Sequence, residues 1–255
     1  MFRKNLLTQM IYRIVTCCVS ALAVLLTFGV FYVGQGADGL TWEFLKYYTN
    51  ISNYFVFAVS VVVLADTVKR VYAGERFGYN RKILNLKFMT TVMILVTFLV
   101  YATLLGEPFT ADFWQNLGNL SYHVFAPLLF IIDYFLFEEK KSVSVFAPLL
   151  SLIIPLVYVC YVFILGAAIK DFEYPYFFLD VNDLGYGGVM VWVVILVLIF
   201  TVLGYLLWLY NRITIENGKL KIDFKNIVWL KKPAERLPAV ESQPVPATPQ
   251  TDDEV

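Results

Sequence analysis

Residues 187–210 read GGVMVWVVILVLIFTVLGYLLWLY and contain no charged side chain. A helix needs about 20 predominantly apolar residues to cross the hydrocarbon core of a bilayer, and this run is long enough. No water reaches the backbone inside hydrocarbon, so a spanning segment must satisfy its own N–H and C=O groups as a helix. We therefore expect residues 187–210 to form a transmembrane helix.

Five further apolar runs precede this one, near residues 11–33, 45–68, 84–105, 118–137 and 145–168. The whole chain is 59% hydrophobic and only 16% charged, whereas soluble domains carry about 25% charged residues. Tyr and Trp side chains gather near the ends of the runs, which is typical of the interfacial belts of membrane proteins. The predicted fold class is an all-α integral membrane protein, a bundle of six transmembrane helices.

The basic residues are divided unevenly between the two sides of the predicted bundle. Eighteen of the 20 Lys and Arg residues belong to the two ends of the chain or to its second and fourth connections, whereas the odd connections are mostly acidic. Lys and Arg residues next to spans stay cytoplasmic during insertion. We therefore predict that residues 1–210 form a six-span membrane domain with both termini in the cytoplasm.

The pattern changes after the last apolar run. Apolar and polar side chains alternate on both sides of Asn217-Gly218, a favoured turn pair. This alternation predicts a short cytoplasmic β-hairpin over residues 212–226, within a segment that covers 211–232. Residues 233–255 are rich in Pro, Gln, Thr and acidic side chains, so we expect this tail to be disordered.

Polar side chains gather at the start of the second and fourth runs: Thr49, Asn50, Ser52 and Asn53 in one, and Asn116, Asn119 and His123 in the other. Spacings of three and four residues place Thr49, Ser52 and Asn53 on one helix face, and Asn116, Asn119 and His123 on one face of the other helix. Both runs are predicted to descend from the outer surface, so Thr49 and His123 should lie at a similar depth, roughly 5–8 Å below it. Polar groups inside a membrane are costly and are often functional.

A threonine hydroxyl and an imidazole in an apolar site can act as a nucleophile and its base. An alcohol needs a neighbour that accepts its proton, and imidazole has a suitable pKa. The candidate oxyanion donors and site-lining residues are Asn50, Ser52, Asn53, Asn119 and Tyr122. The alternative interpretation is that these polar groups only link neighbouring helices. One histidine without a thiolate–carboxylate cluster does not make an ordinary zinc site, so we predict no metal and no other cofactor.

Three short segments resemble the androgen-induced protein family: Trp42-Glu-Phe-Leu45 followed by Thr49, Asn119-Leu-Ser-Tyr-His123 followed by Pro127, and Tyr174-Pro175 followed by Phe178-Leu179-Asp180. The animal members of this family are multi-pass membrane threonine hydrolases that cleave fatty acid esters of hydroxy fatty acids. The resemblance implies that Thr49 is the nucleophile and His123 the base, and it adds Asp180 to the site-lining candidates. The chain is most similar to the six-span prokaryotic branch, which implies location in a prokaryotic cell membrane.

Three classes of function remain open on this evidence. The first is a lipid-ester hydrolase, and the second is an acyltransferase that passes the same acyl group to an alcohol instead of water. The third is a non-enzymatic transporter, receptor or scaffold, although transport is disfavoured because the sequence lacks inverted repeats. The expected partner is a membrane lipid or fatty-acyl ester, and no nucleic acid.

Two carboxylates inside the runs have simpler interpretations. Asp66 lies three and four residues before Lys69 and Arg70, so it should pair with them. Asp133 should link helices or pair with the basic fourth connection. Pro127 should kink the fourth helix just below His123 and open space beside it.

The predicted orientation can be tested by cysteine labelling. A cysteine placed within 107–117 or 176–184 should react with a membrane-impermeant thiol reagent on intact cells, because both segments belong to the odd connections. A cysteine within 72–80 should react only after the cells are opened. Labelling of 72–80 from outside would reverse the orientation and move the Thr49–His123 site to the inner leaflet.

Overall fold

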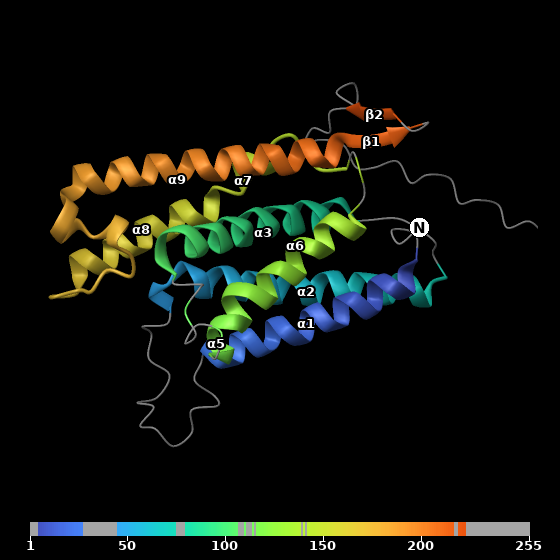
Figure 1. Cartoon of the computed structure of the whole chain (residues 1–255), viewed down its shortest axis with the longest axis horizontal. Helices are drawn as coiled ribbons and strands as arrows, with labels where there is room; N and C mark the ends of the chain where they lie inside the picture. Colours follow the sequence, from blue (N-terminus) through green and yellow to red (C-terminus); the bar gives the residue numbers. More distant parts are fainter. Residues whose placement is uncertain are drawn as a thin grey trace, which may run out of the picture.

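The computed structural model describes residues 5–27, 45–74, 80–106, 110, 114, 116–138, 140, 142–216 and 219–222. Within this part of the chain, six helical segments are long and apolar enough to cross a membrane, judged by length and composition. The protein is therefore an integral membrane protein built from a helical bundle (Figure 1).

The spans are built from these helices: α1 (Leu6–Thr27), α2 (Tyr48–Tyr72), α3 (Arg81–Val100) continued by the π-helix η3 (Tyr101–Leu105), then α5 (Leu117–Leu120), the π-helix η4 (Ser121–Phe125) and α6 (Ala126–Phe137), then α7 (Ala147–Leu150) with α8 (Ile153–Ala168), and α9 (Val181–Arg212). A short 3₁₀ turn, η5 (Phe177–Leu179), precedes α9. The second to fifth spans agree with the sequence prediction to within a few residues.

The first and last spans begin earlier than predicted. Helix α1 begins at Leu6 instead of residue 11, and predicted residues 28–33 lie outside the described part of the chain. Helix α9 begins at Val181 instead of residue 187, because the Asp180 side chain caps its free N–H groups. The polar first turn and the non-helical Gly185 lower the apolar signal there, which is why hydropathy misses it.

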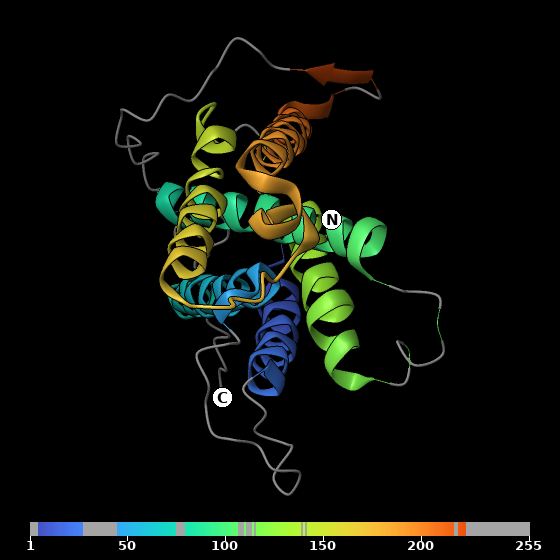
Figure 2. The same ribbon diagram turned by 90° about the vertical axis from the view of Figure 1, so that its left-hand side faces the viewer.

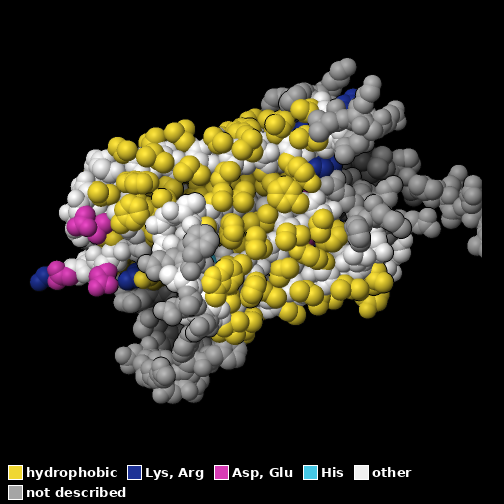
Figure 3. Space-filling view, viewed as in Figure 1, with side chains coloured by type: hydrophobic (Ala, Val, Ile, Leu, Met, Phe, Trp, Pro, Cys, Tyr) yellow, Lys and Arg dark blue, Asp and Glu magenta, His cyan; other side chains and the backbone are white. Residues whose placement is uncertain are grey.

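The third span lies in the middle of the bundle, with α1, α2 and the fourth span on one side and α8 and α9 on the other (Figures 1 and 2). The buried share of the most apolar window is 44% in the third span and 50% in the fourth, against 17% in the fifth and 22% in the first and sixth. Apolar side chains cover the flank of the bundle, and charged groups lie toward its ends (Figure 3). A surface of this kind matches lipid rather than water.

Helix α1 begins at the same end of the bundle at which α9 ends (Figure 1). Beyond α9, strands β1 (Ile213–Glu216) and β2 (Lys219–Ile222) pair antiparallel, with Ile213 opposite Ile222 and Glu216 opposite Lys219. The predicted turn residues Asn217-Gly218 and residues 223–255, which include the predicted tail, lie outside the described part of the chain.

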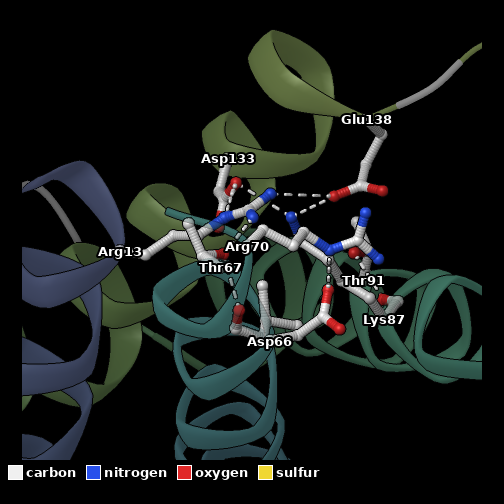
Figure 4. A network of polar contacts seen from close by, with 9 residues as sticks. Arg13, Asp66, Thr67, Arg70, Lys87, Thr91, Asp133 and Glu138 are labelled. Carbon is white, nitrogen blue, oxygen red and sulfur yellow. Dashed lines mark hydrogen bonds and ion pairs between the residues drawn. The ribbon is translucent and has the colours of Figure 1, made fainter. Parts of the chain in front are cut away.

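Four charged side chains from three spans meet inside the bundle near this end (Figure 4). Arg13 of α1 and Lys87 of α3 both contact Asp133 of α6, at 3.3 Å and 2.8 Å. Both cations also contact Glu138, which follows α6, and Arg13 donates to the hydroxyl of Thr67 in α2 at 2.6 Å. None of the four charged side chains is more than 3% exposed. The network contains two positive and two negative charges, so its net charge is zero. The attraction between these charges offsets the free-energy cost of removing them from water.

This network identifies the partners of Asp133. It links helices, as one of the two sequence interpretations held, and within the described residues its ion-pair partners are Arg13 and Lys87. The Lys and Arg count treated both cations as loop residues, yet each lies inside a helix. Asp66 pairs with Arg70 at 2.8 Å, as their spacing predicts.

Replacing Lys87 by Met should strongly destabilise the bundle. Asp133 and Glu138 would then share Arg13 as their one remaining cation in the network, and breaking a buried pair costs about 3–5 kcal/mol. We expect a clearly lower midpoint of thermal unfolding in detergent. Arg70→Met is the control, since it removes a more peripheral i,i+4 pair worth about 0.3–0.5 kcal/mol. Equal effects of the two substitutions would contradict the network's structural role.

Candidate functional site

His123 lies in a π-helical turn in the first third of the fourth span. In η4 the N–H of Ala126 donates to the carbonyl of Ser121, five residues earlier. Pro127 has no N–H, and its ring would clash with the carbonyl four residues before it, so the helix widens at this point. The sequence predicts a kink at Pro127 that opens space beside His123; the structure has this widened turn there, and the ring of Tyr101 covers the imidazole. Single π-helical turns of this kind occur frequently at functional sites.

The ring of Tyr101 covers the ring of His123. The two ring centroids are 3.3 Å apart and the planes are nearly parallel, at 13°. Tyr101 belongs to a second π-helical turn, closed by a 2.7 Å hydrogen bond from the Gly106 N–H to the Tyr101 carbonyl. A Cβ at Gly106 would lie 2.6 Å from the Tyr101 ring, so glycine is required for this stack. His123 is 8% exposed, and its Nδ1 has no hydrogen-bond partner within the described residues.

Thr49 lies in the first turn of α2 and contacts Tyr176, which precedes η5. The Thr49 N–H donates to the Tyr176 hydroxyl at 3.3 Å, and the two hydroxyl oxygens are 3.4 Å apart. Tyr176 lies outside the spans, and its burial raises the pKa of the phenol above its usual value. Tyr176 is therefore a neutral hydroxyl at physiological pH and can donate a hydrogen bond next to Thr49.

Asn53 connects the Thr49 region to the turn that holds His123. Its Nδ2 group donates to the carbonyl of Thr49 and to the carbonyl of Tyr122, both at 2.9 Å. Ser52 also donates to the Thr49 carbonyl at 2.9 Å. Asn53 thus links α2 to the fourth span, and Ser52 links α2 to α3 by accepting a hydrogen bond from Thr97 at 3.1 Å. This is the helix-linking role of polar groups in membranes. Within the described chain, no hydrogen bond joins the Thr49 and His123 side chains directly.

The Thr49 side chain lies in the wall of a pocket between α2, α3, α8, α9 and the segment around η5. The unfilled volume is about 670 Å³, part of it open to the surroundings. Most of the wall is apolar, with Val96, Leu156, Val197 and Phe200 among its members, and no charged side chain lines it in the part of the chain that is described. His123 is not among the lining residues. The pocket therefore suits an apolar chain that lies beside Thr49.

The remaining candidates from the sequence occupy other places. Asn50 and Tyr122 line a separate, more polar hollow next to Leu26 and Thr27 of α1. Tyr122 donates its hydroxyl to the side chain of Asn119 at 3.0 Å, so this group is committed away from Thr49. The Asp180 side chain accepts hydrogen bonds from the N–H groups of Asn182 and Asp183 as the N-cap of α9. Neither pocket is lined by Asp180.

Sequence reasoning did not single out the tyrosines that surround Thr49 and His123, namely Tyr48, Tyr101, Tyr158 and Tyr176. Tyrosines in membrane spans are commonly assigned to the interfacial belt. That assignment gives no reason to expect them in a site inside the bundle. The only available signal was that the segment containing Tyr176 belongs to the same predicted leaflet as Thr49. Periodicity along one helix cannot show which distant segment it will meet.

The fold and this pocket define the class of the protein: a polytopic α-helical membrane protein with a threonine in the wall of an apolar pocket. Comparison with protein-family models, curated proteins and solved structures gave no match in any of the three. In the described part of the chain, no group of three or more His, Cys, Asp or Glu side chains is arranged to hold a metal ion. Trp42 and Glu43, which contribute to the resemblance noted above, lie outside the described residues.

The stack on His123 can be tested by chemical modification, because His123 is the only histidine in the chain. Gly106→Ala should displace the Tyr101 ring, and diethyl pyrocarbonate should then modify His123 faster than in the unaltered protein. Mass spectrometry measures the fraction of protein molecules in which His123 is modified. Gly187→Ala is the matched control, since a Cβ there meets no atom within 4 Å. Equal modification rates in all three proteins would show that Tyr101 does not shield His123.

Proposed function

We propose that this protein is an intramembrane lipid-ester hydrolase in which Thr49 is the nucleophile and His123 the base. The observation that carries the proposal is the position of Thr49, which lines an apolar pocket and whose hydroxyl lies next to the Tyr176 phenol. The resemblance to the androgen-induced protein family supplies the reaction class. The substrate would be a fatty acid ester of a hydroxy fatty acid or a similar lipid ester.

The reaction proceeds in two balanced steps. The Thr49 oxygen attacks the ester carbonyl carbon while His123 accepts the hydroxyl proton, and the acyl–oxygen bond to the alcohol then breaks. The departing alcohol takes the proton from the imidazolium, leaving an acyl-threonine. A water molecule then attacks this acyl group with His123 again as base, which releases a fatty acid and restores Thr49.

Tyr176 is the best-placed donor for the oxyanion in this mechanism. Its hydroxyl lies 3.4 Å from the Thr49 oxygen, and as a neutral phenol it can donate to charge that develops on the substrate carbonyl. No direct hydrogen bond joins Thr49 to His123 within the described chain, so the proposed mechanism requires either a bridging water molecule or a movement of the side chains that brings the imidazole to Thr49. Asn53 supports this route because it fastens α2 to the turn that contains His123.

The proposal includes a location and an orientation. The uneven distribution of Lys and Arg supports cytoplasmic termini, a cytoplasmic β-hairpin after α9 and a site in the outer leaflet. Arg13 and Lys87 lie inside helices but near the same end of the bundle as the other basic groups, so they do not weaken this argument. The resemblance supports a prokaryotic cell membrane.

An acyltransferase is the second candidate, and the apolar wall of the pocket favours it. Water is scarce among side chains such as Val96, Leu156 and Val197, so an alcohol from a second lipid could reach the acyl-threonine first. The chemistry up to the acyl-threonine is identical. Analysis of the products with and without a long-chain alcohol separates the two enzymes. The remaining alternative is a transporter, receptor or scaffold that catalyses no reaction.

Substitutions at Thr49 and His123 test the proposed chemistry. Thr49→Ala should abolish labelling by a fluorophosphonate probe and reduce lipid-ester hydrolysis by several orders of magnitude, because a nucleophile is worth that much in rate. Thr49→Ser should retain part of the activity, since it keeps the hydroxyl. His123→Ala should reduce both labelling and turnover, because the alcohol then stays protonated. Monodispersity in detergent should be unchanged, since a single polar link in a membrane averages about 0.6 kcal/mol.

Thr97→Ala is the matched control for Thr49→Ala. Thr97 lines the same pocket, but its hydroxyl is committed to Ser52 and to the carbonyl of Met93, so labelling and turnover should persist. If Thr49→Ala hydrolysed every ester that the unaltered protein cleaves, Thr49 would not be the nucleophile. The scaffold or transporter interpretation would then replace the enzyme.

A further inference from the structure

The pocket beside Thr49 is lined by five polar side chains: Tyr48, Thr49, Thr97, Tyr158 and Tyr176. The hydroxyls of Thr49 and Tyr176 lie against each other at 3.4 Å. Tyr158 donates to the carbonyl of Lys46 at 2.6 Å, and Thr97 donates to the Ser52 hydroxyl at 3.1 Å. Four of the five hydroxyls are therefore engaged with the protein itself.

Tyr48 is the exception. It is only 9% exposed, and its hydroxyl has no hydrogen-bond partner within the described residues. Its ring packs between Tyr158 and Phe200, at centroid distances of 5.1 Å and 6.3 Å, and both of these residues also line the pocket. A buried donor without a partner destabilises a protein by about 1–3 kcal/mol, so it needs an explanation. An oxygen atom on a bound ligand would provide the missing partner.

The lining of the pocket restricts the chemistry of that ligand. No Lys, Arg or His side chain lines it in the described part of the chain, so a carboxylate inside would be an unpaired buried charge. A plain hydrocarbon chain would leave the Tyr48 hydroxyl without a partner. A neutral acyl ester avoids both costs, because its carbonyl oxygen accepts a hydrogen bond and its chain matches the apolar wall.

We propose that Tyr48 is a ligand-binding residue whose hydroxyl donates to the oxygen of a neutral lipid ester held in this pocket. The inference deepens the proposed function, and rests on it in taking the ligand to be the substrate. It names the substrate class as an ester that presents no carboxylate to the pocket. A fatty acid ester of a hydroxy fatty acid would have to keep its own carboxylate outside, toward the interface.

The test measures binding, so that it does not depend on hydrolysis. The Thr49→Ala protein in lipid nanodiscs is titrated with radiolabelled methyl decanoate, undecane and sodium decanoate, and empty nanodiscs are subtracted. Methyl decanoate should bind more tightly than either of the others. Adding Tyr48→Phe should weaken methyl decanoate about fivefold, as expected for one net hydrogen bond, and leave undecane unchanged. The infrared band of an isotope-labelled ester carbonyl should lose its hydrogen-bonded component in the same variant.

Tyr158→Phe is the matched control inside the same pocket. Its hydroxyl is bound to the Lys46 carbonyl, so this substitution should lower stability and leave the ratio of ester to alkane affinity unchanged. Tyr48→Phe should not lower stability in the absence of ligand, since it removes an unpaired buried hydroxyl. An unchanged ester-to-alkane ratio in Tyr48→Phe, or tighter binding of decanoate than of its ester, would overturn the inference. Loss of hydrolysis in Thr49→Ala bears only on the proposed function, so the two can fail separately.

Discussion

Arg13 and Lys87 can stay charged inside the bundle because Asp133 and Glu138 lie between them. Each pairing joins side chains from different helices, so the ion pairs fix the rotation of α1, α3 and α6 about their axes. Thr67 adds α2 to the same group through its hydrogen bond with Arg13. A charge without its partners would be very costly in hydrocarbon, and that cost makes this arrangement of four spans specific.

The opposite end of the bundle depends on this arrangement. Once α2 and the fourth span are fixed as neighbours, Asn53 can reach the carbonyls of both Thr49 and Tyr122. The widened turn before Pro127 then directs His123 toward Tyr101, whose own turn is held open by the absence of a side chain at Gly106. Apolar packing positions the rest of the pocket. The ion pairs at one end of the bundle and the candidate site at the other therefore depend on the same arrangement of helices.

The sequence predicted those features whose signal is local. Each span has its own apolar run, and the Asp66–Arg70 pair has its own i,i+4 spacing. The contacts that define the site join distant residues, such as Thr49 and Tyr176, which are 127 positions apart. Helical periodicity shows that Asn50 and Thr49 lie on different faces, but it does not show which face meets the apolar pocket and which meets α1. Pro127 predicted a kink, whereas the turn around His123 also requires the carbonyl of Ser121 to bond five residues ahead.

The contact between Thr49 and Tyr176 has a consequence for how the proposed nucleophile is activated. Without a ligand, the two hydroxyls partner each other, and neither is a base strong enough to deprotonate the other. An ester carbonyl that enters the pocket can accept a hydrogen bond from the Tyr176 hydroxyl, and the phenol oxygen is then still free to accept a hydrogen bond from Thr49. A phenol oxygen is too weak a base to remove the Thr49 proton, so the proposed mechanism assigns that step to the imidazole of His123, whose Nδ1 has no partner within the described chain. On the proposed mechanism, the Tyr176 hydroxyl that lies against Thr49 in the empty pocket is therefore the same group that donates to the ester carbonyl when the substrate is bound.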